Sequence, residues 1–276
     1  MTALEKLVLA LAKAFFAIFP FERGKQTAAN AIYLKLLPGI KGQTLFKVGT
    51  IKYRLDLHDR IQAIFYMTKL YETETLNAAF KILSVQKDDP VILDVGANVG
   101  LMSLQIKDHF PTAKIHLFEA DPTVYRQLVD NIELNQLTDL KVNKLAVSAI
   151  SGESLTFVKS ISSMESGWGR IQNEENKNYT AEKYIVQSVS IDQYLKDHQI
   201  THVDLLKIDV EGAEALVLKG AAFALRAKII RTIICEINPA ALSAFASSPE
   251  EISLLLASFG YAFVRQVDMN SIYSTN

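Results

Sequence analysis

The residues with the clearest potential for chemistry follow two apolar runs that are typical of buried strands. Residues 91–95 include Asp94 and continue into a loop with glycines at Gly96 and Gly100. Glycine allows a turn where a side chain would clash, and the amides that start the next helix attract negative groups. The second run ends at Glu119, 23 positions after Gly96, about where nucleotide-binding folds place a carboxylate for ribose hydroxyls. The loop alone could be a simple strand-to-helix turn, but together the two features predict a nucleoside cofactor site.

A lysine and an aspartate mark the end of a later apolar run, residues 203–209. Lys207 and Asp209 are two positions apart, so in a strand their side chains point to the same face. A lysine in an apolar strand is costly unless it is paired, which makes a structural ion pair one interpretation of Lys207. Asp209 is a candidate catalytic residue, because ligands of open α/β sheets bind outside the carboxyl ends of the strands.

The next apolar run, residues 230–236, ends in Glu236 and is followed by Asn238. Both should reach the same edge of the sheet as Asp209. Two carboxylates and an amide oxygen would suit magnesium or calcium. The alternative is free of metal: Asp209 acts alone as a general base, and Glu236 pairs with Lys207. The sequence favours the second account, because no spacing demands a metal and Lys207 needs a partner.

Strand and helix patterns alternate along most of the chain. This alternation predicts an α/β fold in which a parallel sheet is covered by helices on both faces. Strands are expected at 91–95, 114–119, 141–146, 203–209 and 230–236, with a last pair near 261–267 and the C-terminus. Helices are expected at 100–109, 122–135, 212–226 and 248–258, and residues 61–83 form a helix that bends around 71–74.

An insertion at about residues 150–200 interrupts the alternation. Residues 155–158 and 184–189 have the pattern of a β-hairpin, and the polar stretch between them contains the single tryptophan, Trp168. Long loops in compact domains are functional or disordered. We therefore expect residues 160–180 either to be disordered or to form a lid, with Trp168 contacting the substrate.

The apolar N-terminus, residues 4–21, has three interpretations. Lys13 in its middle and the lack of a small-residue cleavage site argue against a spanning helix and a signal peptide. An amphipathic helix that packs on the domain or a partner is the preferred interpretation. Peripheral attachment to a membrane is the alternative, supported by the basic residues that follow.

The composition excludes several classes of protein. With 29 basic and 30 acidic residues, the chain offers no electrostatic case for nucleic-acid binding. Cys235 is the only cysteine, so an intramolecular disulfide and a cysteine-rich zinc site are excluded. A reducing, cytoplasmic location fits this composition, with membrane association and homo-oligomerisation left open.

Several of these motifs closely resemble those of the FkbM family of S-adenosylmethionine-dependent methyltransferases. Residues 94–100 resemble its cofactor loop, and residues 118–122 its second-strand motif, with Ala120 where proline is common. Residues 206–214 and 217–221 resemble its most distinctive signature. Weaker matches are Tyr71-Glu72-Thr73-Glu74, Asn131 with Asn135, residues 189–195, and Glu236. The resemblance runs from about residue 53 to 267.

The resemblance implies a class I methyltransferase fold: a Rossmann-like, mostly parallel seven-stranded sheet with one antiparallel strand. The implied domains are an N-terminal helical extension (1–50) and a methyltransferase domain (51–276). The implied cofactor is S-adenosylmethionine, and the implied reaction is methyl transfer to a hydroxyl of a sugar, glycan or secondary metabolite. The candidate cofactor-binding residues are then Asp94, Gly96, Ala97, Asn98, Gly100, Glu119, Ala120, Ala146 and Asp209. The candidate catalytic residues are Asp209, Lys207 and Glu236, and the candidate acceptor-binding residues are Trp168 and Glu211. No metal is expected at the site.

Two other classes of function stay open. A nicotinamide-dependent oxidoreductase could use the same sheet, but its first loop would prefer glycine at Asn98, and residues 206–214 would have no role. A methyltransferase-like binding or scaffold protein without turnover is the other alternative.

Overall fold

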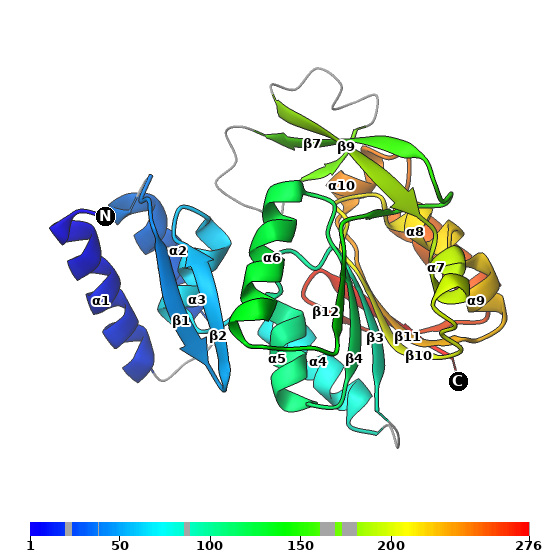
Figure 1. Ribbon diagram of the computed structural model, residues 1–276, viewed down its shortest axis with the longest axis horizontal. Helices are drawn as coiled ribbons and strands as arrows, with labels where there is room; N and C mark the ends of the chain where they lie inside the picture. The colour runs from blue at the N-terminus through cyan, green and yellow to red at the C-terminus, as the bar shows by residue number, and fades with distance from the viewer. Residues whose placement is uncertain (20–23, 38, 86–88, 161–168, 173–180, 276) are drawn as a thin grey trace.

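A seven-stranded sheet forms the centre of the computed structural model, which describes residues 1–19, 24–37, 39–85, 89–160, 169–172 and 181–275 (Figure 1). β13 runs antiparallel to its two neighbours, whereas the pairs β11–β10, β10–β3, β3–β4 and β4–β5 are parallel. The predicted fold class is therefore confirmed. In spatial order the strands are β12 (Ala262–Val267), β13 (Asn270–Ser274), β11 (Ile230–Glu236), β10 (Val203–Ile208), β3 (Val91–Val95), β4 (Lys114–Phe118) and β5 (Leu140–Asn143).

Helices cover both faces of this sheet, and each face has its own apolar core. Neighbouring strand residues alternate between the cores: Ile92 and Leu205 belong to one, Leu93 and Leu206 to the other. The first core is covered by α4 (Thr73–Leu83), α5 (Leu101–His109) and α6 (Pro122–Leu134). The second is covered by α7 (Ile191–Asp197), α8 (Glu214–Lys219), α9 (Ala222–Arg226), α10 (Pro239–Ser243) and α11 (Pro249–Ser258).

Two predicted elements are divided in the structure. The helix expected at 212–226 becomes α8 and α9, because the carboxylate of Asp192 accepts hydrogen bonds from the amides of Phe223 and Ala224 and so begins a new helix. The strand expected at 141–146 ends at Asn143. The chain then leaves the sheet, and β6 (Ala146–Val147) pairs with β9 instead.

The insertion forms a second, four-stranded sheet in the order β6–β9–β7–β8. The predicted hairpin is confirmed as β7 (Ser154–Ser160) and β9 (Ala181–Val189), with the short β8 (Arg170–Ile171) beside β7. Lys159 of β7 forms an ion pair of 3.1 Å with Asp121, which caps α6, so the hairpin is attached next to the end of β4. Trp168 and the remaining parts of the predicted lid lie outside the described residues.

The N-terminal residues form α1 (Ala3–Ile18), α2 (Lys25–Leu36), β1 (Gln43–Val48), β2 (Ile51–Asp56) and α3 (Arg60–Thr68), which we call the N-terminal unit. Its three helices share a third apolar core, whereas the buried residues of its hairpin, such as Phe46 and Tyr53, belong to the first core. The hairpin β1–β2 turns at residues 49–50, where we placed the domain boundary, which stays a prediction. Of the helices that the structure describes, none reaches the length and apolarity that a membrane crossing requires.

Side-chain amides at α6 hydrogen-bond to the backbone of β2 along the edge that does not pair with β1. Asn135 binds both backbone groups of Lys52, and Asn131 accepts a hydrogen bond of 2.7 Å from the Arg54 amide. Gln127 donates to the Arg54 carbonyl at 3.0 Å. Asn131 also donates to the carbonyl of Val99 in the first loop. These bonds join the N-terminal unit to the loop after β3, and they explain the motif residues Asn131 and Asn135.

Candidate active site

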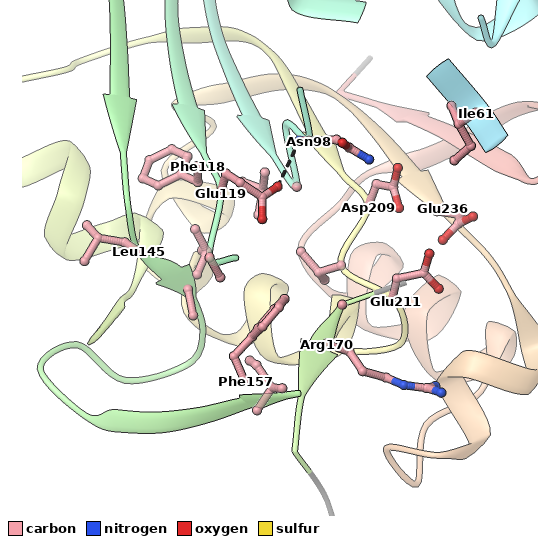
Figure 2. A pocket seen from close by; sticks show the side chains of 18 of the residues that line it. Ile61, Asn98, Phe118, Glu119, Leu145, Phe157, Arg170, Asp209, Glu211 and Glu236 are labelled. Carbon is pink, nitrogen blue, oxygen red and sulfur yellow. Dashed lines mark hydrogen bonds between the residues drawn. The ribbon is translucent and has the colours of Figure 1, made fainter. Parts of the chain in front are cut away.

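A pocket lies at the carboxyl ends of β3, β4 and β10, bordered by the insertion (Figure 2). Of the predicted site residues, Gly96, Asn98, Glu119, Ala120 and Ala146 line it. Asp209, Glu211 and Glu236 line its other side. The predicted residues Asp94, Ala97, Gly100 and Lys207 are buried and do not line the pocket. The structure thus brings together the two clusters that the sequence placed at strand ends.

The loops that follow β3 and β10 touch at Gly96. This glycine has a left-handed φ of +82°, and a Cβ atom built on it would lie 1.7 Å from the carbonyl oxygen of Asp209. The Asp209 amide in turn donates to the carbonyl of Val95 at 3.0 Å. Only glycine permits this contact, which fixes Asp209 beside the first loop.

Glu119 links the first loop to the start of α6. Its Oε2 atom accepts a hydrogen bond from the Asn98 amide at 3.0 Å, and its Oε1 atom accepts one from the Asp121 amide at 2.8 Å. Burial raises the pKa of Glu119 to about 7, although these amides favour the charged form. Each carboxylate oxygen keeps a lone pair for a hydroxyl donor in the pocket.

Lys207 is held by carboxylates, as the structural interpretation of the sequence required. Its Nζ atom lies 3.2 Å from Asp209 Oδ2 and 3.5 Å from Asp94 Oδ1. Burial opposes its charge, but Asp209, Asp94 and Glu72 outweigh burial and raise the pKa of Lys207, so it stays protonated. The expected pair with Glu236 is wrong, because Asp94 on the neighbouring strand β3 is already opposite Lys207 in the sheet register.

Asp209, Glu211 and Glu236 form a carboxylate cluster in which one oxygen atom of each residue lies within 4.8 Å of the others (Figure 2). Burial, together with the charges of Asp209, Glu211 and Glu214, raises the pKa of Glu236 to about 9. Glu236 is therefore protonated at neutral pH and hydrogen-bonds Asp209. A divalent cation could replace that proton, since the donors are hard oxygens.

Asn238 does not complete this cluster as a metal ligand. Its Oδ1 atom accepts hydrogen bonds from the amides of Ala240 and Ala241, so it caps α10. Glu211 takes the third place in the cluster because its backbone is left-handed, with φ of 55°. Glu214 is structural: its Oε1 atom accepts hydrogen bonds from the amides of Val210 and Gly212.

Glu72 is a pocket residue that we did not assign to the site from sequence. It precedes α4 in a left-handed conformation with φ of 39°, which is strained for a side-chain residue. Within the described part of the chain, its buried Oε2 atom has no hydrogen-bond partner. Burial raises the pKa of Glu72, and Lys207 opposes this shift. The signal was present in the Tyr71–Glu74 motif, at the bend between two helices.

The opposite wall of the pocket is apolar. It combines residues that follow β4 and β5 with two residues of the insertion, Phe157 and Ile171. Ala146 was predicted here; Leu145, Val147, Phe157 and Ile171 were not assigned. Phe157 and Ile171 pair across β7 and β8, a pairing that only the folded insertion reveals.

Replacing Glu236 with glutamine should stabilise the protein at pH 8. An acid whose pKa rises from 4.5 to about 9 on folding contributes stability at low pH that is lost as pH rises between those values. The Glu236→Gln variant keeps a neutral side chain, so it should gain on the order of 2 kcal/mol over wild type at pH 8 and little at pH 5. Urea unfolding at both pH values measures this. The exposed Glu133→Gln variant is the control, and an equal gain for both variants would contradict the prediction.

Comparisons with known proteins agree with this geometry. Residues 94–263 match the model of the Methyltransferase FkbM domain. The methyltransferase sdnD of Sordaria araneosa is 34% identical over 48% of this chain and 60% of its own length. The 2-O-methyltransferase NoeI of Sinorhizobium fredii is 26% identical over 54% of this chain and 64% of its own length. The hexuronic acid methyltransferase AglP of Haloferax volcanii is 24% identical over 64% and 65%.

These matches share one property: the chain spans less than two thirds of each relative's length. Among solved structures, the METTL16 MTase domain aligns with a TM-score of 0.49 at 13% identity, covering 99% of this chain and 81% of that one. The FkbM match covers more than half of the chain and includes Asp94, Glu119, Asp209 and Glu236. The chain therefore belongs to the FkbM family of methyltransferases.

Proposed function

We propose that the chain is an S-adenosylmethionine-dependent O-methyltransferase that acts on a hydroxyl of a sugar, glycan or secondary metabolite. One observation carries the proposal. Glu119 after β4 and Asp209 after β10 line the same pocket, so a ribose-binding carboxylate and a candidate base lie on either side of one cavity. The names of NoeI and AglP support an oxygen or sugar acceptor.

The charge of the pocket fits this cofactor. Its described lining residues include five carboxylic acids, Glu72, Glu119, Asp209, Glu211 and Glu236, and one base, Arg170. S-adenosylmethionine carries a sulfonium and an ammonium group against one carboxylate. The excess of acids over the single base favours it even with Glu236 protonated. The unpartnered Oε2 atom of Glu72 would accept a hydrogen bond from the ammonium group, and the apolar wall would hold the adenine.

The protein's part in the reaction is to position groups and remove a proton. When bound, the cofactor supplies an electrophilic methyl group on sulfur. The pocket would align the acceptor oxygen behind that carbon, which provides much of the acceleration. Asp209 would take the hydroxyl proton as the carbon–oxygen bond forms and the carbon–sulfur bond breaks. Lys207 acts as a positioning residue, because its ion pair fixes the Asp209 carboxylate.

Glu119→Gln should weaken the binding of S-adenosylmethionine by roughly 1–3 kcal/mol, because the amide cannot accept hydrogen bonds on both sides. In wild type, affinity should fall as pH drops through about 7, since Glu119 is then protonated and loses acceptors. The variant should lack this pH dependence. Calorimetric titration between pH 6 and 8 measures both effects, with exposed Glu153→Gln as the control. Wild-type affinity in the Glu119 variant would remove this residue from the site.

A screen with a labelled methyl donor tests the proposed function. Glycan and metabolite fractions would be incubated with the protein, and both labelled product and S-adenosylhomocysteine would be measured. Cofactor binding without product from any acceptor class would favour the scaffold alternative. Tight binding of NADH and none of S-adenosylmethionine would favour the oxidoreductase.

A further inference from the structure

The outward surface of α1 is apolar along its whole length. Five large side chains, each between 47% and 82% exposed, follow one another at spacings of three and four residues, which places them on one side of the helix. We call this set the outer stripe: Leu4, Leu7, Leu11, Phe15 and Ile18. Of the charged residues of α1, Lys6 is exposed, whereas Glu5 and Lys13 are half-buried.

None of the apolar cores that the described residues form includes the outer stripe. A different side of α1, formed by Leu9, Ala12 and Phe16, packs into the third core with Tyr33 of α2 and Met67 of α3. Figure 1 shows α1 at the far edge of the N-terminal unit, away from the seven-stranded sheet. The helix is thus stable against the protein on one side and presents a second apolar side outward.

Lys13, which argued against a spanning helix, does not interrupt the outer stripe. Its ammonium group lies over the rings of Phe46 and Tyr66, 4.8 and 4.6 Å from their centroids. It therefore faces β1 and α3 and leaves the outward side of α1 free of this charge.

We propose that the outer stripe docks on an anionic membrane surface, with α1 lying in the plane of the lipid headgroups. Residues 1–50 contain seven basic and two acidic residues, whereas residues 51–276 contain 22 and 28. The first 50 residues are thus basic in a protein that is acidic elsewhere, and the exposed residues Lys35, Lys41 and Lys47 contribute to this charge. Apolar burial and attraction to anionic lipids act together at such surfaces.

The residues beside the outer stripe favour lipid over a partner helix. Helices that pair through such a stripe carry charged residues on its flanks, which select the partner. Here Ala10 and Ala17 lie on one flank and Val8 on the other. The exposed charge of α1 is Lys6 alone, which gives a partner helix little to select, whereas an anionic lipid surface attracts it together with the basic residues that follow.

Vesicle co-sedimentation of the full chain tests the proposal. Wild type should bind vesicles of phosphatidylcholine with phosphatidylglycerol, and binding should weaken with salt and without the anionic lipid. The Leu7→Glu/Leu11→Glu variant should lose at least about tenfold in partitioning. Ala10→Glu/Ala17→Glu adds the same charge to the same helix outside the outer stripe and should lose less. Unchanged thermal unfolding shows that both variants are folded.

Three results would overturn the proposal. Wild type could fail to bind anionic vesicles, or the two variants could lose vesicle binding equally. The third result is a wild-type dimer that Leu7→Glu/Leu11→Glu converts to a monomer without a change in vesicle binding. The last result would assign the outer stripe to a second copy of the chain. Should the glutamate variants unfold, Leu11→Trp gives an independent reading. Brominated lipids should quench its added fluorescence, and a lack of quenching would contradict the docking.

Discussion

Asp209→Asn should lower methyl transfer by roughly 10²- to 10⁴-fold, the usual contribution of a positioned general base. Asparagine keeps the shape of the side chain but cannot take the acceptor proton. Binding of S-adenosylmethionine should stay close to wild type, because the contacts of Glu119 and the first loop remain. Single-turnover rates with labelled donor and a calorimetric titration separate the two quantities. Exposed Asp130→Asn is the control.

Chelation decides whether Asp209 acts with a metal. Both accounts predict that Asp209→Asn is inactive, so this variant cannot distinguish them. If exhaustive EDTA treatment abolishes the wild-type reaction and magnesium restores it, the Asp209–Glu211–Glu236 cluster is a cation site and the metal-free prediction fails. If EDTA has no effect and the rate depends on the loss of one proton, the general-base role is supported. An active Asp209→Asn variant would contradict both accounts.

Gly96→Ala should destabilise the protein by about 3 kcal/mol or more and prevent cofactor binding. The new methyl group would overlap the Asp209 carbonyl oxygen at 1.7 Å, so the loops after β3 and β10 would have to separate. The left-handed backbone adds a further cost of about 1 kcal/mol. Urea unfolding measures the loss of stability.

Gly152→Ala is a matched control for this substitution. Gly152 has the same φ of +82°, but a Cβ atom there would meet nothing within 4 Å. It should therefore show only the cost of the left-handed conformation. Similar losses in the two variants would mean that backbone strain, and not the contact with Asp209, makes Gly96 necessary.

The sequence predicted those features that depend on local pattern. Strand ends carry Glu119, Asp209 and Glu236, and parallel strands bring their carboxyl ends to one edge, so the site followed from the order of strands. It was harder to predict which polar side chains bind each other across neighbouring strands. Lys207 pairs with Asp94 because of the β3–β10 register, and Asn238 is used as a helix cap, neither of which a linear pattern specifies.

Pocket residues from distant segments were also missed. Glu72 enters the site because the chain bends between α3 and α4, and Phe157 enters because the insertion folds over the end of β4. Both depend on tertiary contacts that periodicity does not encode. The left-handed backbones at Glu72 and Glu211 have the same origin: the packed surroundings hold conformations that the local sequence alone disfavours.

The bonds between α6 and β2 let a helix take the place of a neighbouring strand. Gln127, Asn131 and Asn135 recur every four residues, a helical advance of about 6 Å, while Lys52 and Arg54 are about 6.6 Å apart along a strand. The two repeats match closely enough for Asn131 to bind Arg54 while Asn135 binds Lys52, and Gln127 adds a second bond to Arg54. An open strand edge invites pairing with other chains and aggregation. Here two side chains of α6 and its C-cap residue Asn135 cover the edge of the hairpin, so no additional strand is needed.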